Sequence, residues 1–590
     1  MIDPNNNDNN DNTNNNENNE LLKWNLLQLE TKEILSECYF PTKNKDDNND
    51  ITSSSLSSTS TSNYKTLLNM QEYKESIKNI LDKLPSHKSL VKVDNNTLSY
   101  LKSDLYKKYK SEWDISYDKS SMFDGIKTIG SYEHNTMTTS YGNGGNIVPT
   151  IDIAFMLNEK FWKDKDYLNY RYYDKRNLMI LHIGQYLSKK KFMNKIGNVQ
   201  LSYLRNDVRK LVLLISPPTI SASKKKLKIK FQIRILVGGT SFPFPYCRLF
   251  PNCNNLPKES NSNNPTNIYN HGIIEDFSYV DNDKTVQDTI SSSEVTITNF
   301  EESLILLKVW SSTRGLRNAH DGLTSYELTM IMIYCYRTKK ISRGMTILQV
   351  FTTVLHFIKE LFHPSNSKKK YIIMPSSNHD NNCDQELSYQ KEYKNTTLLQ
   401  GYKENNNNEM QIPIFLNEQR TMNIFTRFTV TSYKLIYHHI SHTCNSQKSW
   451  NVQSLFLQSK RFWNIYDCYL QISKPKFNYK AIQDQIPLNY IDIGNKEEYT
   501  MQCICYILSH ALNDRISLIR PYTTGNGVHT DDIPIWSLDS KPPKCNQYVI
   551  GIQFNNNNNE ALTRMVDKCD DTKNKELFQF IFGDKIEVRI

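Results

Sequence analysis

Two neighbouring stretches decide the fold: Gly130-Ser131-Tyr132, and the apolar run Val148-Pro149-Thr150-Ile151-Asp152-Ile153-Ala154-Phe155-Met156. A glycine–serine turn lets the main chain come close to a phosphate and offer its N–H groups to the oxygens. The apolar run predicts a strand, in which alternate residues share a face. A pair of metal ions would therefore need a second carboxylate at position 150 or 154. Those positions carry Thr150 and Ala154.

A strand predicted at 227–236 would have to supply a further carboxylate, but it carries none. It alternates the apolar Leu227, Ile229, Phe231, Ile233 and Ile235 with Lys228, Lys230, Gln232 and Arg234. This pattern is typical of a half-buried strand with a basic open face. Two-metal phosphoryl transfer needs several anionic oxygens around cations about 4 Å apart. The stretch therefore predicts a nucleotidyltransferase-like domain of the polymerase-beta type that has lost its metal site. From these residues alone, a chance occurrence stays the alternative.

Short motifs follow this strand in a fixed order. They are Asp166 to Arg176 (DYLNYRYYDKR); Arg248-Leu249-Phe250-Pro251 with Asn254-Asn255; Pro265-Thr266 with Tyr269-Asn270 and Ile274-Glu275-Asp276; Lys308-Val309-Trp310 with Arg314-Gly315; and Phe580-Ile581-Phe582-Gly583 with Lys585-Ile586-Glu587-Val588-Arg589. Their order, from about Leu21 to Ile590, resembles the Nrap family, the nucleolar RNA-associated proteins of the small-subunit processome. That family also lacks the carboxylate absent at Ala154. The chain differs from it at Phe582, where the family has tryptophan-like neighbours, and in its shorter length.

The resemblance implies a multidomain α+β and α/β protein, which we divide as follows. Residues 1–87 are an Asn-rich, disordered N-terminus with two amphipathic helices, at about 20–38 and 64–84. Residues 88–290 are the inactive nucleotidyltransferase-like domain, and 291–445 are a helical domain similar to that of poly(A) polymerases and oligoadenylate synthetases, with an Asn-rich insertion. Residues 446–545 form a third, mixed α+β domain. Residues 546–590 are the truncated start of a second nucleotidyltransferase-like domain.

The charge of the chain suits an anionic partner. The net charge is +10 and the sequence pI is about 8.8, which favours a partner such as nucleic acid. The lysine runs at 189–191 and 368–370 are expected to be solvated loops. The run beside the predicted nucleotide cleft is different, and its members are the RNA-binding candidates Lys224, Lys225, Lys226, Lys228, Lys230 and Arg234.

The sequence gives little support for a metal site, a secretory signal or a membrane-spanning segment. The 11 cysteines include no C-x-x-C pair, which is typical of thiols in a reducing compartment. The cluster His438, His439, His442 and Cys444 lies on a predicted helix, 431–441, without a second ligand pair, so we expect no zinc site. Met1 leads into Asn and Asp rather than a secretory signal. No apolar run reaches the length of a membrane span.

The resemblance implies a non-catalytic scaffold and RNA-binding protein of the nucleolus, acting in ribosome biogenesis and pre-18S rRNA processing. Its implied partners are pre-ribosomal RNA and other small-subunit processome proteins, including an rRNA-processing factor and a casein-kinase-containing subcomplex, with no cofactor. Two alternatives stay open. One is an active RNA nucleotidyltransferase in which Asp152 acts with Glu275 or Asp276. The other is a pseudoenzyme that binds nucleotide at Gly130 and Ser131. Whether the chain is a fragment or the product of a split or shortened gene also stays open.

Overall fold

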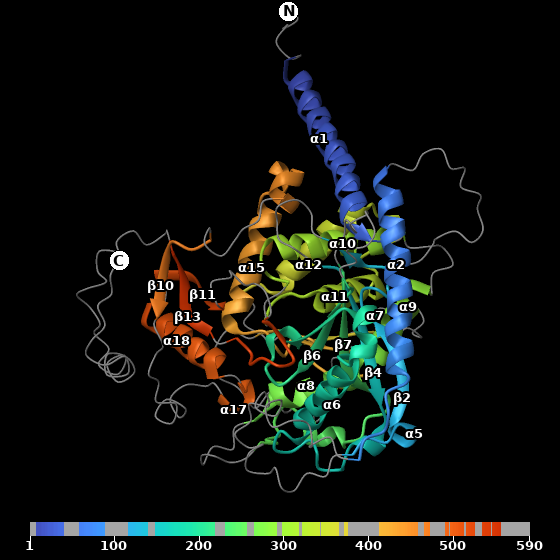
Figure 1. Cartoon of the computed structure of the whole chain (residues 1–590). Coiled ribbons are helices and arrows are strands. Elements are labelled where there is room, and N and C mark those ends of the chain that lie inside the picture. The colour runs from blue at the N-terminus through green and yellow to red at the C-terminus, as the bar shows by residue number, and fades with distance from the viewer. Residues whose placement is uncertain are drawn as a thin grey trace, which may run out of the picture.

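The computed structural model describes the chain in separate ranges. They are 8–40, 58–88, 116–139, 148–218, 231–256, 265–291, 298–317, 321–342, 344–364, 371–375, 412–457, 465–472, 490–494, 496–512, 515–525, 534–543 and 545–555. Figure 1 shows a sheet with helices packed around it, a helical region beside the sheet, and a smaller sheet at one side. The N-terminal helix projects from this body.

A six-stranded mixed sheet organises the first module. Its strand order is β12-β5-β6-β7-β4-β2. The bounds are β2 Phe123–Ile129, β4 Thr150–Leu157, β5 Asn198–Tyr203, β6 Leu211–Ser216, β7 Gln232–Gly239 and β12 Ile535–Ser537. Strand β4 is parallel to β7 and antiparallel to β2. The sequence predicted β2, β4, β6 and β7, although β7 begins later than position 227, and it missed β5 and β12.

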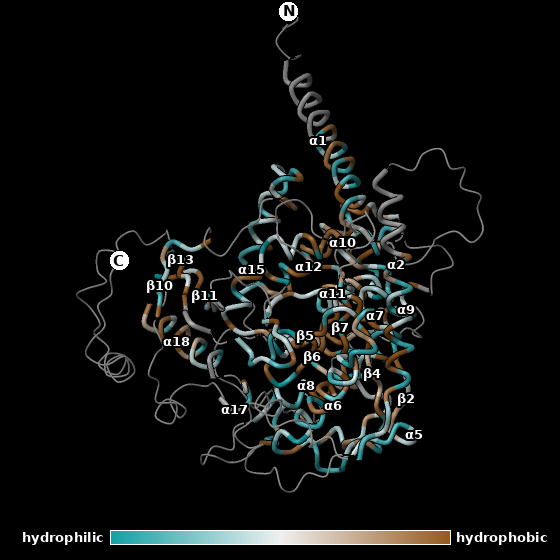
Figure 2. Tube along the Cα trace, viewed as in Figure 1, coloured by the Kyte–Doolittle hydropathy of each residue, from teal (hydrophilic) through white to brown (hydrophobic). Residues whose placement is uncertain are grey.

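Strand β4 is apolar on both faces, as expected of an interior strand, and it lies between β7 and β2. One face, with Ile151, Ile153 and Phe155, belongs to the large core that also contains residues of α6, Arg171–Leu187. The other face, with Ala154 and Met156, belongs to a smaller core against which residues of α9, Tyr279–Ser291, pack. Figure 2 shows the hydrophobic residues concentrated along β4 and β7. Because side chains alternate along a strand, Asp152 lies on the Ala154 face, toward α9.

Further helices and short strands complete this module. They are α2 Ser58–Leu81, α5 Lys119–Met122, α7 Lys190–Ile196, α8 Asn267–Phe277, β1 Tyr39–Phe40 and β3 Met137–Thr138. The helix predicted at about 167–190 is α6, and a separate helix, α7, follows it. The expectation of a loop at 189–191 is therefore wrong for Lys190 and Lys191, which begin α7.

The second module is helical, as predicted. Its helices are α10 Thr298–Thr313, α11 Ser325–Arg337, α12 Ile347–Leu361 and α15 Val430–Asn445, with the parallel strands β8 Tyr371–Ile373 and β9 Ile414–Leu416. The predicted cap of α11 is confirmed at Thr324, which forms a capping box with Glu327. The predicted Asn-rich insertion, from about 376 to 410, lies outside the described residues.

The third module contains a small sheet in the order β10-β13-β11. The bounds are β10 Cys468–Ile472, β11 Ile516–Gly525 and β13 Cys545–Phe554, with helices α17 Tyr490–Ile493 and α18 Lys496–Leu512. Strand β13 pairs with both neighbours. The predicted boundary at 546 falls inside this central strand, so residues up to Phe554 belong with the third module. The rest of the division at 546–590 stays a prediction outside the described residues.

Strand β12 comes from the third module but completes the sheet of the first. It pairs with β5, where Trp536 lies opposite Leu201. The Trp536 ring packs on Tyr203 with 4.7 Å between centroids. The Ser202 hydroxyl donates a hydrogen bond to the Pro534 carbonyl at 2.9 Å. These contacts join the two modules across more than 300 residues of sequence.

The N-terminal helix α1, Asp8–Cys38, is longer than the sequence predicted. Its last turns pack Leu27, Ile34 and Leu35 into the core of the helical module. We expected disorder up to about residue 19, whereas the helix in the structure begins at Asp8. Within the described part of the chain, no helix combines the length and the apolar composition that a membrane crossing requires.

Candidate functional site

The strand aspartate of the predicted nucleotide site is held by an arginine. Asp152 on β4 and Arg234 on β7 are direct neighbours in the parallel register. Nε of Arg234 donates to Oδ1 of Asp152 at 2.6 Å, and Nη2 donates to Oδ2 at 3.0 Å. This is the bidentate geometry of a strong charge-assisted pair. Both oxygens that would coordinate a metal ion are therefore engaged by a guanidinium of the same chain.

This pairing changes the role that the sequence suggested for Arg234. We expected its side chain on a basic open face for RNA. Instead its guanidinium binds Asp152, with the Arg234 side chain 27% exposed. Arg234 is therefore a poor RNA-binding candidate. The other candidates, Lys224, Lys225, Lys226, Lys228 and Lys230, lie outside the described residues and stay predictions.

The glycine–serine turn is occupied by a carboxylate. Gly130 has φ +74°, a conformation that favours glycine. Its N–H donates to Oδ1 of Asp283, on α9, at 3.2 Å. The same oxygen lies 2.7 Å from Nε2 of His134. The carbonyl of Ser131 accepts the N–H of Thr136 at 2.9 Å, which closes the turn on itself. The Asp283 carboxylate thus takes the place that a phosphate oxygen would need at the Gly130 N–H.

The Gly130 turn and Asp152, which together we call the remnant site, are close together. A Cβ built on Gly130 would lie 3.4 Å from Oδ2 of Asp152. The predicted cradle and the predicted metal ligand are thus brought together, as the sequence suggested. The Gly130 turn holds the carboxylate of Asp283, an anion, where a phosphate would bind. Asp152 holds the guanidinium of Arg234, a cation, where a metal ion would bind. Among the described residues, no three His, Cys, Asp or Glu side chains are placed to hold a metal ion.

Two further cations lie between this turn and the helical module. Lys308 on α10 is 1% exposed, and its Nζ donates to the carbonyl and hydroxyl of Thr136 at 2.8 and 2.9 Å. Burial, with Arg317 nearby, lowers the pKa of Lys308 well below its usual range. Arg317 donates to the hydroxyl of Thr138 at 2.7 Å, and burial together with Arg234 lowers its pKa to about 10. These groups attach the turn and β3 to α10.

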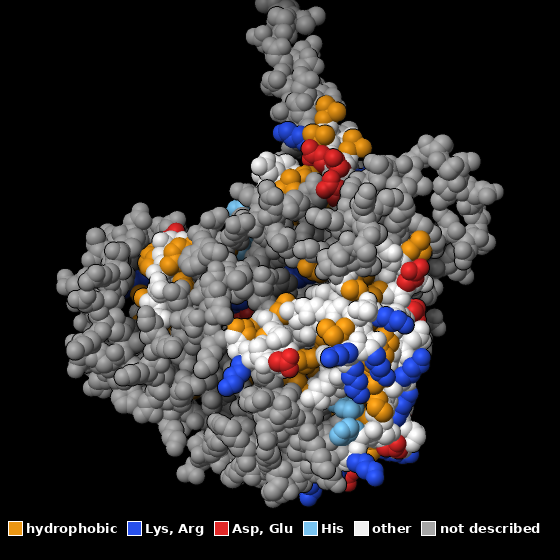
Figure 3. All heavy atoms as spheres, in the orientation of Figure 1, with side chains coloured by type: hydrophobic (Ala, Val, Ile, Leu, Met, Phe, Trp, Pro, Cys, Tyr) orange, Lys and Arg blue, Asp and Glu red, His pale blue; other side chains and the backbone are white. Residues whose placement is uncertain are grey.

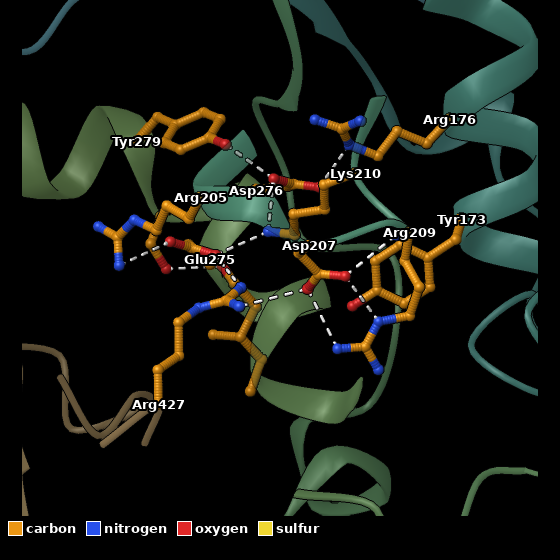
Figure 4. Close-up of polar contacts among 12 residues, drawn as sticks. Tyr173, Arg176, Arg205, Asp207, Arg209, Lys210, Glu275, Asp276, Tyr279 and Arg427 are labelled. Atoms are coloured by element: carbon orange, nitrogen blue, oxygen red, sulfur yellow. Dashed lines mark hydrogen bonds and ion pairs between the residues drawn. The ribbon is translucent and has the colours of Figure 1, made fainter. Parts of the chain in front are cut away.

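The acids proposed as alternative metal ligands, Glu275 and Asp276, belong to a different cluster (Figure 4). Nζ of Lys210 lies 2.7 Å from Oε2 of Glu275 and 2.9 Å from Oδ1 of Asp276. Nε of Arg176 donates to Oδ2 of Asp276 at 2.8 Å. The side chains of Lys210, Arg176 and Asp276 are fully buried. Burial opposes ionisation of Glu275, but Lys210 and Arg427 lower its pKa well below the usual range.

This buried charge cluster connects the first two modules. Its members are Arg176, Arg205, Asp207, Arg209, Lys210, Glu275, Asp276, Glu327 and Arg427. Arg427, from the helical module, bridges Asp207 at 3.3 Å and Glu275 at 3.1 Å. Arg205 reaches Glu327 of the helical module at 3.0 Å. Buried charges persist only when they are paired, so these pairs define how the modules meet.

The third module contacts the same region through Asp492 on α17. Its carboxylate accepts the N–H groups of Ile268 and Tyr269, at the first turn of α8, at 3.0 and 2.7 Å. Arg209 donates to the Asp492 carbonyl at 2.6 Å. An anion is favoured at a helix N-terminus, but burial is the larger effect and raises the pKa of Asp492 to about 6. Asp492 therefore docks the third module on α8.

The motif residues noted in the sequence are largely structural. Asn255 donates to the side chain of Asn270 at 2.8 Å, and its own N–H is accepted by the Thr266 hydroxyl at 3.1 Å. Tyr173 donates to the Tyr269 carbonyl at 2.8 Å. Sequence reasoning missed the cluster members Arg205, Asp207, Arg209, Lys210, Glu327, Arg427 and Asp492. A usable signal was the group of charged residues Asp207, Arg209 and Lys210 directly before the continuous apolar strand 211–215.

Comparisons with known proteins agree with the geometry. Residues 74–292 match Nrap protein domain 1, residues 299–459 match the Nrap protein PAP/OAS-like domain, and residues 462–590 match Nrap protein domain 3. The U3 small nucleolar RNA-associated protein 22 of Saccharomyces cerevisiae is 22% identical over 88% of this chain and 40% of its own length. Nucleolar protein 6 of Homo sapiens is 27% identical over 38% of this chain and 19% of its own length. The chain thus spans less than half the length of these relatives.

Among solved structures, the Cid1 poly(U) polymerase is 9% identical, with a TM-score of 0.28 over 66% of this chain and 98% of that chain. A similarity this low carries no argument about activity. The match to the PAP/OAS-like domain agrees with the observed helical module beside a nucleotidyltransferase-like sheet.

Proposed function

Because the chain belongs to the Nrap family, we propose that it is a non-catalytic assembly factor of ribosome biogenesis that binds pre-ribosomal RNA in the nucleolus. Its relatives are named as a U3 small nucleolar RNA-associated protein and a nucleolar protein. Those names support the pathway and the compartment. The proposed partners are pre-ribosomal RNA and small-subunit processome proteins, among them an rRNA-processing factor and a casein-kinase-containing subcomplex.

The proposal that the protein is not a catalyst rests on one observation: side chains of the protein itself occupy both the metal position and the phosphate position of the remnant site. Arg234 engages both carboxylate oxygens of Asp152, and Asp283 accepts the N–H of Gly130. Phosphoryl transfer depends on metal ions and on donors aimed at the phosphate. Here internal side chains satisfy both sets of groups, so the fold serves as a scaffold.

An active nucleotidyltransferase would need more carboxylates around Asp152. Glu275 and Asp276 were the alternative ligands, but their charges are balanced by Lys210, Arg176 and Arg427 in the buried cluster. Releasing them would leave those cations buried without partners, at a cost of several kcal/mol each. This argues against the enzymatic alternative.

A pseudoenzyme that binds nucleotide would need a free phosphate position at the turn. The carboxylate of Asp283 competes directly for that position, because it holds the Gly130 N–H and the His134 ring. The negative charge of Asp283 would repel a triphosphate placed at this turn. We therefore favour RNA binding on the outer surface over nucleotide binding at the Gly130 turn.

The catalytic question is tested by incubating the protein with a labelled ribonucleotide mixture, an RNA primer and Mg²⁺ or Mn²⁺. We expect no extension of the primer by the wild-type protein. The control is Asp152→Asn, which removes the remnant carboxylate charge while keeping its size. Primer extension by the wild-type protein that disappears in this variant would overturn the proposal.

The RNA part is tested by crosslinking in cells. We expect ultraviolet crosslinks between the protein and precursor rRNA, in a nucleolar fraction. Crosslinks only to mature rRNA or to messenger RNA would contradict the proposed place in ribosome assembly, whatever the result of the nucleotide assay.

A further inference from the structure

One part of the sequence is almost free of negative charge. Between Asp174 and Glu259, the only acidic residue is Asp207. Asp207 is 4% exposed and is paired with Arg209 and Arg427. It therefore contributes little negative charge to the surface. The described surface formed by this stretch includes helix α7 and the residues that flank it.

Helix α7 and the residue before it present a group of exposed lysines. Lys189 precedes the helix, and Lys190, Lys191 and Lys195 lie on it; all four are exposed. Within the described part of the chain, none of the four forms an ion pair with a carboxylate. Four exposed cations within seven consecutive positions produce a concentrated positive potential.

The helix is held firmly, so these charges have defined positions. The hydroxyl of Tyr73, on α2, donates to the carbonyl of Ile196 at the end of α7. Phe192 of α7 packs on Tyr186 of α6, with 5.2 Å between ring centroids. Gly197 ends the helix with φ +74°. A Cβ there would lie 2.4 Å from the Ser216 carbonyl, so no larger side chain fits this turn.

The same surface continues onto the end of α2. The hydroxyl of Tyr186 donates to the carbonyl of Lys83 at 2.9 Å, and Lys83 and Lys88 are both exposed. Figure 3 shows Lys and Arg side chains gathered on the side of the molecule where α2 and α7 lie, with few acidic side chains among them. We call Lys83, Lys88, Lys189, Lys190, Lys191 and Lys195 the α7 patch.

The chemistry of this patch fits phosphate groups rather than bases. Its aromatic rings are not free for stacking: Tyr186 is 6% exposed, and the Nζ of Lys191 lies 4.7 Å from the Phe192 ring centroid. Proteins that hold unpaired bases use exposed aromatic platforms. Duplex RNA is instead recognised through its backbone and shape. Compact ammonium groups without aromatic platforms match the second mode.

We propose that the α7 patch binds the phosphate backbone of double-helical RNA. This inference rests on the proposed RNA-binding function and assigns it to a surface outside the remnant nucleotide site. An acidic protein segment is the competing partner, and the experiment separates the two. The α7 patch does not include the lysines at 224–230.

The test compares two variants of the full chain by titration with a fluorescent RNA duplex at several salt concentrations. The patch variant carries Lys190→Gln, Lys191→Gln and Lys195→Gln, and glutamine retains the helix propensity of α7. The control carries Lys160→Gln, Lys163→Gln and Lys165→Gln. These control lysines are also exposed, but they follow the opposite end of β4 and are interleaved with Glu159 and Asp164. Circular dichroism and melting curves check that both variants are folded.

We expect the patch variant to bind the duplex about tenfold or more weakly at physiological salt. We expect its plot of log affinity against log salt to be flatter by roughly two to three units, since each phosphate contact contributes about 0.7–0.9. The control should resemble the wild-type protein. Polyglutamate should not displace the duplex from wild-type protein at equal charge concentration, and single-stranded RNA should bind more weakly.

Three results would overturn the inference. Equal loss in both variants would mean that only net charge matters. Unchanged affinity and slope in the patch variant, with a wild-type protein that binds RNA, would remove the α7 patch while leaving the proposed function intact. Displacement by polyglutamate would identify an acidic protein as the better partner. A wild-type protein that binds no RNA would instead refute the RNA part of the proposed function.

Discussion

Replacing Asp283 by alanine tests whether an internal carboxylate occupies the phosphate position. The substitution removes the acceptor of the Gly130 N–H, at 3.2 Å, and of His134 Nε2, at 2.7 Å. Hydrogen bonds to a charged group contribute about 1.5–3 kcal/mol each. The Asp283 side chain is 18% exposed and its bond to Gly130 is long, so we expect a total loss of roughly 2–3 kcal/mol.

The Asp283→Ala variant should bind ATP at the Gly130 turn, which we do not expect of the wild-type protein. With Asp283 removed, the Gly130 N–H and the His134 ring become free to bind a phosphate oxygen. ATP at about five times its Kd would then stabilise the variant by roughly 1 kcal/mol, which corresponds to about 2–4 °C in Tm for a module of this size. The assay is thermal melting with ATP in EDTA, because the expected binding needs no metal ion.

The matched control is Asp281→Ala. Asp281 is an exposed acid on the same helix, so the change in charge is the same. We expect neither the control nor the wild-type protein to be stabilised by ATP. An equal ATP-dependent rise in Tm for wild-type protein and the Asp283 variant would refute the reasoning. No rise in the variant would show that the turn does not provide a phosphate site.

Three further predictions concern charged side chains at the remnant site and between the modules. Lys210→Met should lower the free energy of unfolding by about 3–5 kcal/mol, and adding Glu275→Gln should cost less than the sum of the two single changes; additive losses in urea unfolding would contradict this coupling. Arg234→Gln should cost about 1–3 kcal/mol without creating a metal site, because among the described residues no three His, Cys, Asp or Glu side chains are placed to hold a metal ion; a Mn²⁺-dependent rise in Tm would argue against this. The pKa of Asp492 rises from 3.8 to about 6 on folding, so the folded state binds the additional proton and stability falls as pH rises through this window. Asp492→Asn should therefore gain up to about 3 kcal/mol relative to the wild-type protein between pH 4 and 7, and a pH-independent difference in melting would exclude this.

The central part of the fold could be predicted from the sequence because its signals are local. Strand β4 is a continuous apolar run interrupted by Asp152, and the helices of the second module follow the helical period. The cap at Thr324 was readable from Glu327 three residues later. The absence of carboxylates at Thr150 and Ala154 was equally local, and the prediction of a lost metal site rests on it.

The features that could not be predicted from the sequence depend on contacts between residues far apart in the chain. Asp283 reaches Gly130 across 153 positions, and no local pattern distinguishes it from the other acids of α9. The alternation in β7 placed Arg234 opposite the apolar face, but it could not show that Asp152 lies beside it. Strand β12 has only three residues, which is too short for a periodic signal, and its partner β5 lies far upstream.

The β12 pairing has a practical consequence for anyone who shortens this protein. A version that ends after the helical module would lose Trp536 and leave the outer hydrogen-bonding edge of β5 uncovered, with the Tyr203 ring exposed beside it. Uncovered strand edges of this kind pair with strands of other molecules. Such a version should self-associate and come out of solution, even though every residue of its own two modules is present.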